Sequence, residues 1–171
     1  MKNIIIMAAG ASSRMKKTLD EVDLSTKVKE VASLEHKTLI PLDGKGKSLL
    51  FYLCSNVKQA GYENVYILTS LENKAFHQWI DFNKSDPEIK GLKFFLSIQN
   101  IPQGRQKPMG TADGIQQALD QFPELLKQRF TVCNADNLYS INVLKSLLHH
   151  NTSLHSIIAY DRSYLKFPEE R

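Results

Sequence analysis

Five short apolar runs recur along the chain and alternate with segments long enough to form helices. They are rich in Ile, Val, Phe and Tyr and almost continuously apolar, as strands covered on both faces of a sheet should be. The predicted strands are residues 3–8, 64–69, 92–98, 130–134 and 156–160. The predicted helices are residues 48–60, 71–83, 111–121 and 141–149, with Gly61 as a stop signal after the first and Pro123 after the third. This order predicts an α/β fold, a three-layer sandwich with a mostly parallel sheet.

The size and composition of the chain are typical of one globular domain. Its 171 residues, 42% of them hydrophobic and 23% charged, argue against a disordered or coiled-coil chain, so we expect residues 1–171 to form a single domain. No apolar run approaches the roughly 18 residues of a membrane span. We therefore expect a cytoplasmic protein with no membrane partner, in which Cys54 and Cys133 are reduced core residues.

Charge alone does not identify a ligand. The formal net charge of +4 suits an anionic small molecule as well as a nucleic acid. The cations are scattered and do not alternate with aromatic residues, so no nucleic-acid partner is expected. The highly charged region 16–37 contains one helical patch, residues 24–34, and we expect it to cross the ligand face as a surface excursion.

The first loop has the composition of a phosphate site. Residues 7–15 read M-A-A-G-A-S-S-R-M and follow the first predicted strand, where parallel sheets usually bind phosphate. Small residues let backbone N–H groups approach a polyphosphate, and hydroxyls add donors. The candidate nucleotide-binding residues are Ala8, Ala9, Gly10, Ala11, Ser12 and Ser13. Arg14 adds a cation with bidentate geometry for phosphate oxygens. An ordinary tight turn with an exposed arginine is the alternative interpretation.

This loop resembles the A-A-G-x-G-[ST]-R-[ML] signature of the nucleotidyltransferases that activate sugar phosphates and related compounds. Ser12 stands in place of the second glycine, as it does in molybdopterin-type members of the wider superfamily. The resemblance implies a Rossmann-like nucleotide-binding fold of the nucleotide-diphospho-sugar transferase type. Because members are usually longer, we expect the chain to correspond to their N-terminal, nucleotide-binding part, and two interpretations stay open: a chain truncated at the C-terminus, or a shortened homologue.

A second element surrounds Lys37. Residues 36–41 read H-K-T-L-I-P and resemble the family element P-K-x-L-x-P, with His36 in place of the first proline. The resemblance implies that Lys37 neutralises phosphate charge near the reacting centre. A surface lysine beside a turn is the alternative.

A third element opens the predicted helix 111–121. Residues 107–112 read K-P-M-G-T-A and resemble the family element P-x-G-T-A-x-A, which implies packing against the base and ribose. Gly110 and Thr111 stand at a helix N-terminus, where free N–H groups favour polar or anionic ligand groups. Lys107 is either a phosphate contact or a solvated charge. A proline-rich loop before a capped helix is the alternative for the whole segment.

The predicted strand 130–134 runs into the sequence N-A-D-N, which puts a carboxylate at its carboxyl end. The resemblance implies that Asp136 binds Mg²⁺. A carboxylate suits this role, because Mg²⁺ is a hard cation that is held by one or two carboxylates together with phosphate oxygens and water. The metal would bridge the attacked phosphate and neutralise developing charge. An Asx turn or an N-cap for the next helix is the alternative.

Together these elements predict an NTP-dependent nucleotidyltransferase. It would transfer NMP from an NTP to a sugar 1-phosphate and release pyrophosphate, with Arg14, Lys37 and Asp136 as catalytic residues. Two alternatives stay open. A molybdopterin-type cytidylyl- or guanylyltransferase is favoured by Ser12 and disfavoured by the G-T-A element. A non-catalytic NTP-binding module is the other. The base, the acceptor and the oligomeric state are left open.

Overall fold

The computed structural model describes residues 2–10, 29, 36–150, 154–161 and 163, and its centre is a four-stranded sheet in the order β3-β2-β1-β4. The three pairings between these strands are all parallel, as predicted. The strands are β1 (Asn3–Met7), β2 (Asn64–Thr69), β3 (Lys93–Ile98) and β4 (Phe130–Asn134). The helices are α3 (Leu49–Ala60), α4 (Lys74–Asn83), α5 (Thr111–Gln121), the 3-10 helix η1 (Pro123–Lys127) and α6 (Ile141–His149).

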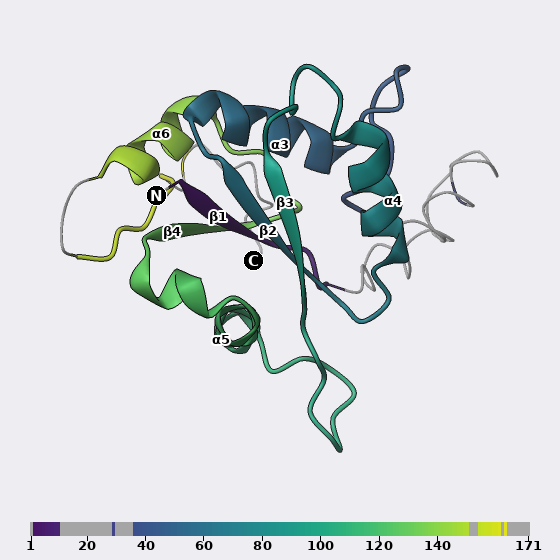
Figure 1. The fold of residues 1–171 in the computed structure, drawn as a ribbon, viewed down its shortest axis with the longest axis vertical. Coiled ribbons are helices and arrows are strands. Elements are labelled where there is room, and N and C mark those ends of the chain that lie inside the picture. The colour runs from purple at the N-terminus through teal and green to yellow at the C-terminus, as the bar shows by residue number, and fades with distance from the viewer. Residues whose placement is uncertain (1, 11–28, 30–35, 151–153, 162, 164–171) are drawn as a thin grey trace.

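Helices cover both faces of this sheet and make three layers (Figure 1). Ile4 and Ile6 of β1 point into a core that they share with α3, α4 and α6. Ile5 points to the opposite face, where it packs with residues of α5 and η1. All three isoleucines are fully buried. The continuously apolar run in the sequence therefore follows from a strand that is covered on both sides.

Local signals in the sequence set the ends of α3. The Ser48 side chain accepts a hydrogen bond from the Phe51 N–H at 3.4 Å and caps the first turn. Gly61 ends the helix with φ +101°, a conformation that favours glycine. Helix α4 begins at Lys74, three residues later than predicted, and the exposed Leu71 precedes it.

The predicted fifth strand is wrong. Residues 156–160 form no strand, and Ile157 is 90% exposed. In the structure this segment lies beside β4 and α6 and lines an open groove with them, without pairing to the edge of β4.

The handedness of the connections gives a physical reason for this outcome. Helices α3 and α4 lie on one face of the sheet and carry the chain outward from β1 through β2 to β3. Helix α6 packs beside α3 on that same face. To reach a parallel strand beyond β4 through α6, the chain would move across the sheet in the direction opposite to its steps from β1 to β2 and from β2 to β3. The connecting helix would still lie on the same face, so this crossover would have the opposite hand. Nearly all such crossovers are right-handed, which disfavours this strand.

The two cysteines are free and buried, as predicted. Burial raises the pKa of Cys133 to about 12 and raises that of Cys54 as well. Both groups therefore stay protonated thiols at neutral pH. No helix in the described part of the chain is long and apolar enough to cross a membrane.

Candidate functional site

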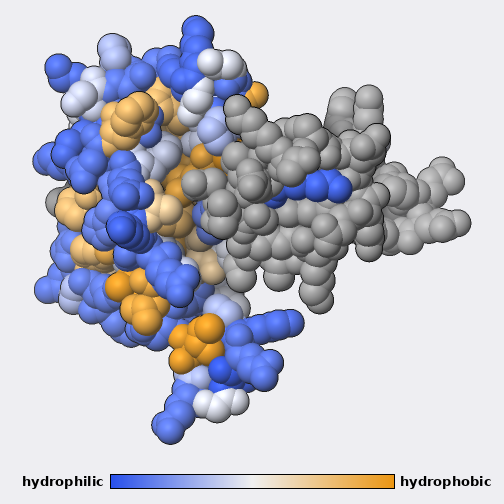
Figure 2. All heavy atoms as spheres, turned by 90° about the vertical axis from the view of Figure 1, so that its right-hand side faces the viewer, coloured by the Kyte–Doolittle hydropathy of each residue, from blue (hydrophilic) through white to orange (hydrophobic). Residues whose placement is uncertain are grey.

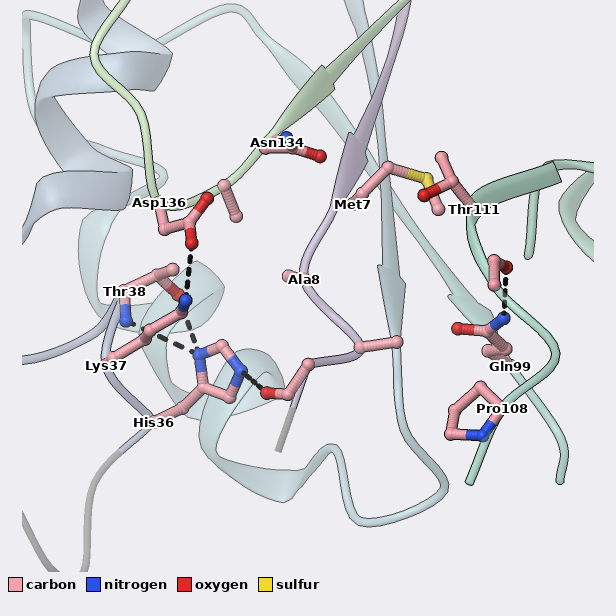
Figure 3. Close-up of a pocket in the computed structure, with 14 residues that line it drawn as sticks. Met7, Ala8, His36, Lys37, Thr38, Gln99, Pro108, Thr111, Asn134 and Asp136 are labelled. Atoms are coloured by element: carbon pink, nitrogen blue, oxygen red, sulfur yellow. Dashed lines mark hydrogen bonds and ion pairs between the residues drawn. The ribbon is translucent and has the colours of Figure 1, made fainter. Parts of the chain in front are cut away.

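A cavity of about 380 Å³ opens where the winding of the sheet reverses. From β1 the chain moves outward through β2 to β3, and then crosses back to β4 on the other side of β1. Ligands of open parallel sheets bind at such a switch point, outside the carboxyl ends of the strands. The lining residues are Met7, Ala8, Ala9, Gly10, His36, Lys37, Thr38, Gln99, Pro108, Gly110, Thr111, Asn134, Ala135 and Asp136 (Figure 3).

Strand register brings the loops after β1 and β4 together. Met7 lies opposite both Leu68 of β2 and Asn134 of β4. The pairing continues one residue further on each side, because the Ala8 N–H donates to the Leu68 carbonyl at 2.7 Å and the Ala135 N–H to the Met7 carbonyl at 3.1 Å. The two loops therefore leave the same edge of the sheet as neighbours, although their residues are more than 120 positions apart.

Lys37 and Asp136 form an ion pair on one side of this cavity. The Lys37 Nζ donates a hydrogen bond to Asp136 Oδ2. The two side chains are 32% and 42% exposed, so the pair is in contact with solvent. Asp136 does not cap α6, because Ser140 does so by accepting from the Val143 N–H at 3.3 Å. The N-cap alternative for Asp136 is therefore wrong, and its carboxylate faces Lys37 instead (Figure 3).

The N-terminus of α5 forms the other side of the cavity. Gly110 is its N-cap residue and has φ +129°, a region that favours glycine. The Gln99 amide nitrogen donates to the Gly110 carbonyl at 3.1 Å and to Asp113 Oδ2 at 3.3 Å, which fixes the start of α5 against the end of β3. Thr111 thus lies across the cavity from the Lys37–Asp136 pair (Figure 3), and Gly110, which precedes it, lines the same cavity.

Most of the predicted site residues that the structure describes line this cavity. Ala8, Ala9, Gly10, Lys37, Gly110, Thr111 and Asp136 all line it. Lys107 does not line it and is exposed on the loop 99–110, which projects from the bottom of the molecule as a mostly hydrophilic arm (Figures 1 and 2). Ala11, Ser12, Ser13 and Arg14 lie outside the described residues, as does the helical patch predicted over 24–34, apart from residue 29.

The cavity is also lined by four polar residues that the sequence analysis did not identify as functional: His36, Thr38, Gln99 and Asn134. Asn134 ends β4 and Gln99 directly follows β3, so their places at strand ends were a usable signal. His36 and Thr38 carry no such signal, because no predicted strand precedes them. Their place in the cavity depends on contacts between distant parts of the chain.

The donor set of this cavity fits a magnesium ion that arrives with a nucleotide. Asp136 supplies a carboxylate and Asn134 an amide oxygen, both hard ligands. Among the described residues, no three His, Cys, Asp or Glu side chains are grouped closely enough to hold a metal on their own. Magnesium is commonly held by one or two carboxylates together with substrate phosphates and water, so a protein-only cage is not required.

Comparison with known proteins adds evidence for the fold. No protein-family model and no curated protein matches the sequence. Among solved structures, the fold is similar to that of UDP-glucose pyrophosphorylase complexed with UDP-glucose, with a TM-score of 0.58 and 20% sequence identity. The match covers 86% of this chain and 52% of the other. The chain therefore has the nucleotide-diphospho-sugar transferase type of fold and spans about half the length of that pyrophosphorylase.

Proposed function

We propose that the chain is a nucleotidyltransferase that transfers NMP from an NTP to a sugar 1-phosphate. The observation that carries this proposal is the cavity at the switch point, which joins the Gly10 loop, the Lys37–Asp136 pair and the N-terminus of α5. The structural neighbour acts on a sugar nucleotide, according to its name, and shares the fold. This likeness supports the reaction class and leaves the base and the sugar open.

The proposed reaction is one displacement at phosphorus. A phosphate oxygen of the sugar 1-phosphate attacks the α-phosphorus of the NTP and forms a new P–O bond. The bond from the α-phosphorus to the bridging oxygen breaks, and pyrophosphate leaves with that electron pair. No covalent enzyme intermediate is needed, so the work of the protein is positioning and charge stabilisation.

Each part of the cavity has a role in this proposal. The backbone of Ala8, Ala9 and Gly10 would hold the triphosphate, and Lys37 would stabilise charge near the α-phosphate. Gly110 and Thr111 would pack against the base and ribose. Arg14, Ala11, Ser12, Ser13 and Lys107 remain predicted phosphate contacts. Asp136, with Asn134 beside it, would hold Mg²⁺, which when bound supplies positive charge to the phosphate oxygens.

Pyrophosphate release tests this function. The purified protein would be incubated with Mg²⁺, each of five NTPs and a panel of acceptors that includes sugar 1-phosphates and molybdopterin. We expect release with one NTP and a sugar 1-phosphate together, and a fall of about 10²–10³ in kcat for Asp136→Asn, as for the loss of one group that stabilises transition-state charge. Asp120→Asn, on the exposed side of α5, is the matched control and should leave kcat unchanged.

The other outcomes separate the alternatives. Release with molybdopterin but with no sugar 1-phosphate would contradict the proposed acceptor. Binding of an NTP without release under any condition would contradict catalysis and leave a nucleotide-binding module.

A further inference from the structure

His36 connects the first loop to the turn that carries Lys37. Its Nε2 lies 2.8 Å from the Gly10 carbonyl oxygen, and its Nδ1 lies 2.9 Å from Thr38 Oγ1 and 3.4 Å from the Thr38 amide nitrogen (Figure 3). Gly10 and Lys37 both line the cavity. The imidazole therefore joins two segments of the candidate site that are 26 residues apart in sequence.

These partners determine where the hydrogen of the imidazole lies. A carbonyl oxygen only accepts, so Nε2 carries a hydrogen and donates it to Gly10. A backbone amide only donates, so Nδ1 has no hydrogen and accepts from Thr38. The Thr38 hydroxyl can rotate to donate to the same nitrogen. The neutral Nε2–H tautomer satisfies all of these contacts at once.

The imidazole is itself held by the two helices behind it. Thr38 is fully buried, and its carbonyl accepts a hydrogen bond from the Leu50 N–H of α3 at 3.0 Å. The ring centroid of His36 lies 5.1 Å from that of Phe76, a buried residue of α4. A donor with a fixed position is therefore presented to Gly10.

Gly10 is a position with conformational freedom. A Cβ atom built there would meet no atom of the described residues within 4 Å, and glycine tolerates a wide range of backbone angles. Because a peptide unit is planar, rotation would move the carbonyl oxygen as part of a rigid group. A carbonyl oxygen turned into the cavity would repel the phosphate oxygens of a bound nucleotide.

We propose that His36 is a positioning residue of the nucleotide site. Its Nε2–H holds the Gly10 carbonyl on the His36 side of the cavity, so that this oxygen does not oppose a bound triphosphate. The role rests on the proposed function, because it presumes an NTP beside Gly10. It also connects the first loop to α3 and α4, so that the Gly10 peptide and Lys37 share one support.

A pair of variants separates positioning from packing. In His36→Gln the side-chain amide can still donate to Gly10, whereas in His36→Leu nothing donates. We expect the leucine variant to bind NTP about tenfold more weakly, the effect of one lost hydrogen bond, and the glutamine variant to bind within about threefold of wild type. His77→Leu, at an exposed position of α4, is the control and should leave the Kd unchanged.

The tautomer is read independently by ¹⁵N NMR of the imidazole nitrogens in the free protein, where we expect the Nε2–H form. The Nδ1–H form, or equal Kd values for the leucine variant and wild type, would overturn the inference while leaving the proposed function intact. Equally weak binding by the glutamine and leucine variants would also overturn it. If the wild-type protein binds no NTP, the proposed function fails, and the positioning role fails with it.

Discussion

At the scale of single residues, the Lys37–Asp136 pair is the feature most relevant to chemistry. The two side chains come from parts of the chain that are 99 residues apart, and both residues line the cavity. Both keep contact with solvent. Exposed ion pairs contribute about 0–1 kcal/mol to stability, so a purely structural reason for this pair is weak.

The proposed role of Lys37 leads to a testable separation of activity from stability. Lys37→Met should lower kcat for pyrophosphate release by about 10²–10³ because the charge near the α-phosphate is lost. It should change the free energy of unfolding by no more than about 1 kcal/mol. Steady-state kinetics and urea unfolding measure the two quantities.

Lys37→Arg is the matched variant for Lys37→Met, because it keeps the charge and changes the geometry. It should recover only part of kcat. A methionine variant with wild-type kcat would show that Lys37 is a surface lysine, as the alternative interpretation holds.

Residues also differ in how far the sequence alone could identify them. Gly10, Gly110 and Asp136 stand in motifs directly beside predicted strands or helices, so their shared place at one sheet edge followed from the expected topology. His36 could not be found in this way. Its proposed role depends on a hydrogen bond to Gly10 and on the ring of Phe76, and both contacts exist only after α3 and α4 have packed.

At the scale of elements, the close approach of α5 to the sheet positions one side of the cavity. Gly114 of α5 is buried, and a Cβ atom there would lie 2.8 Å from Leu68 Cδ2, 2.9 Å from Gln99 Nε2 and 3.0 Å from Met7 Cε. Gln99 and Met7 both line the cavity. A larger residue at this position would therefore force the ends of these three side chains to shift.

Gly114→Ala tests this coupling between helix packing and the site. Alanine favours a helix by about 1 kcal/mol over glycine, whereas overpacking costs about 1–3 kcal/mol. We expect a net loss of about 1 kcal/mol in unfolding free energy by urea denaturation. We also expect weaker NTP binding by titration, because Gln99 must move away from Gly110.

The control for Gly114→Ala is Gln116→Ala, at an exposed position of the same helix, which should leave both quantities close to wild type. An alanine variant at Gly114 that is more stable than wild type and binds NTP equally well would show that α5 is not held at this distance by packing.

The strands also show where prediction from apolar sequence patterns succeeds and where it fails. Four apolar runs became strands because each is covered by helices on both faces, and their sequence composition reports that burial. The run at 156–160 has the same composition and forms no strand. Composition carries no information on crossover handedness, which depends on the face that α6 occupies.

At the scale of the whole molecule, the topology and the candidate site have a common origin. The reversal of winding at β1 leaves the loops after β1 and β4 next to each other, with α5 returning across the opposite face. The sequence predicted the alternation of strands and helices that produces such a site. It could not give the register, which places Met7 opposite both Leu68 and Asn134.

The fold likeness to UDP-glucose pyrophosphorylase belongs to this scale as well. It extends over 86% of the chain at 20% identity, so the arrangement of elements is shared while most side chains differ.

An NTP that binds in the switch-point cavity together with magnesium must stabilise the folded protein, so thermal unfolding with each of five NTPs, with and without Mg²⁺, measures this binding. A ligand at 100 times its Kd stabilises by about 2.7 kcal/mol, which raises Tm by about 5–10 °C in a domain of this size. We expect such a rise with one NTP and Mg²⁺, little with Mg²⁺ alone, and a much smaller rise in Asp136→Asn. No rise with any NTP, or an equal rise in Asp136→Asn, would contradict it.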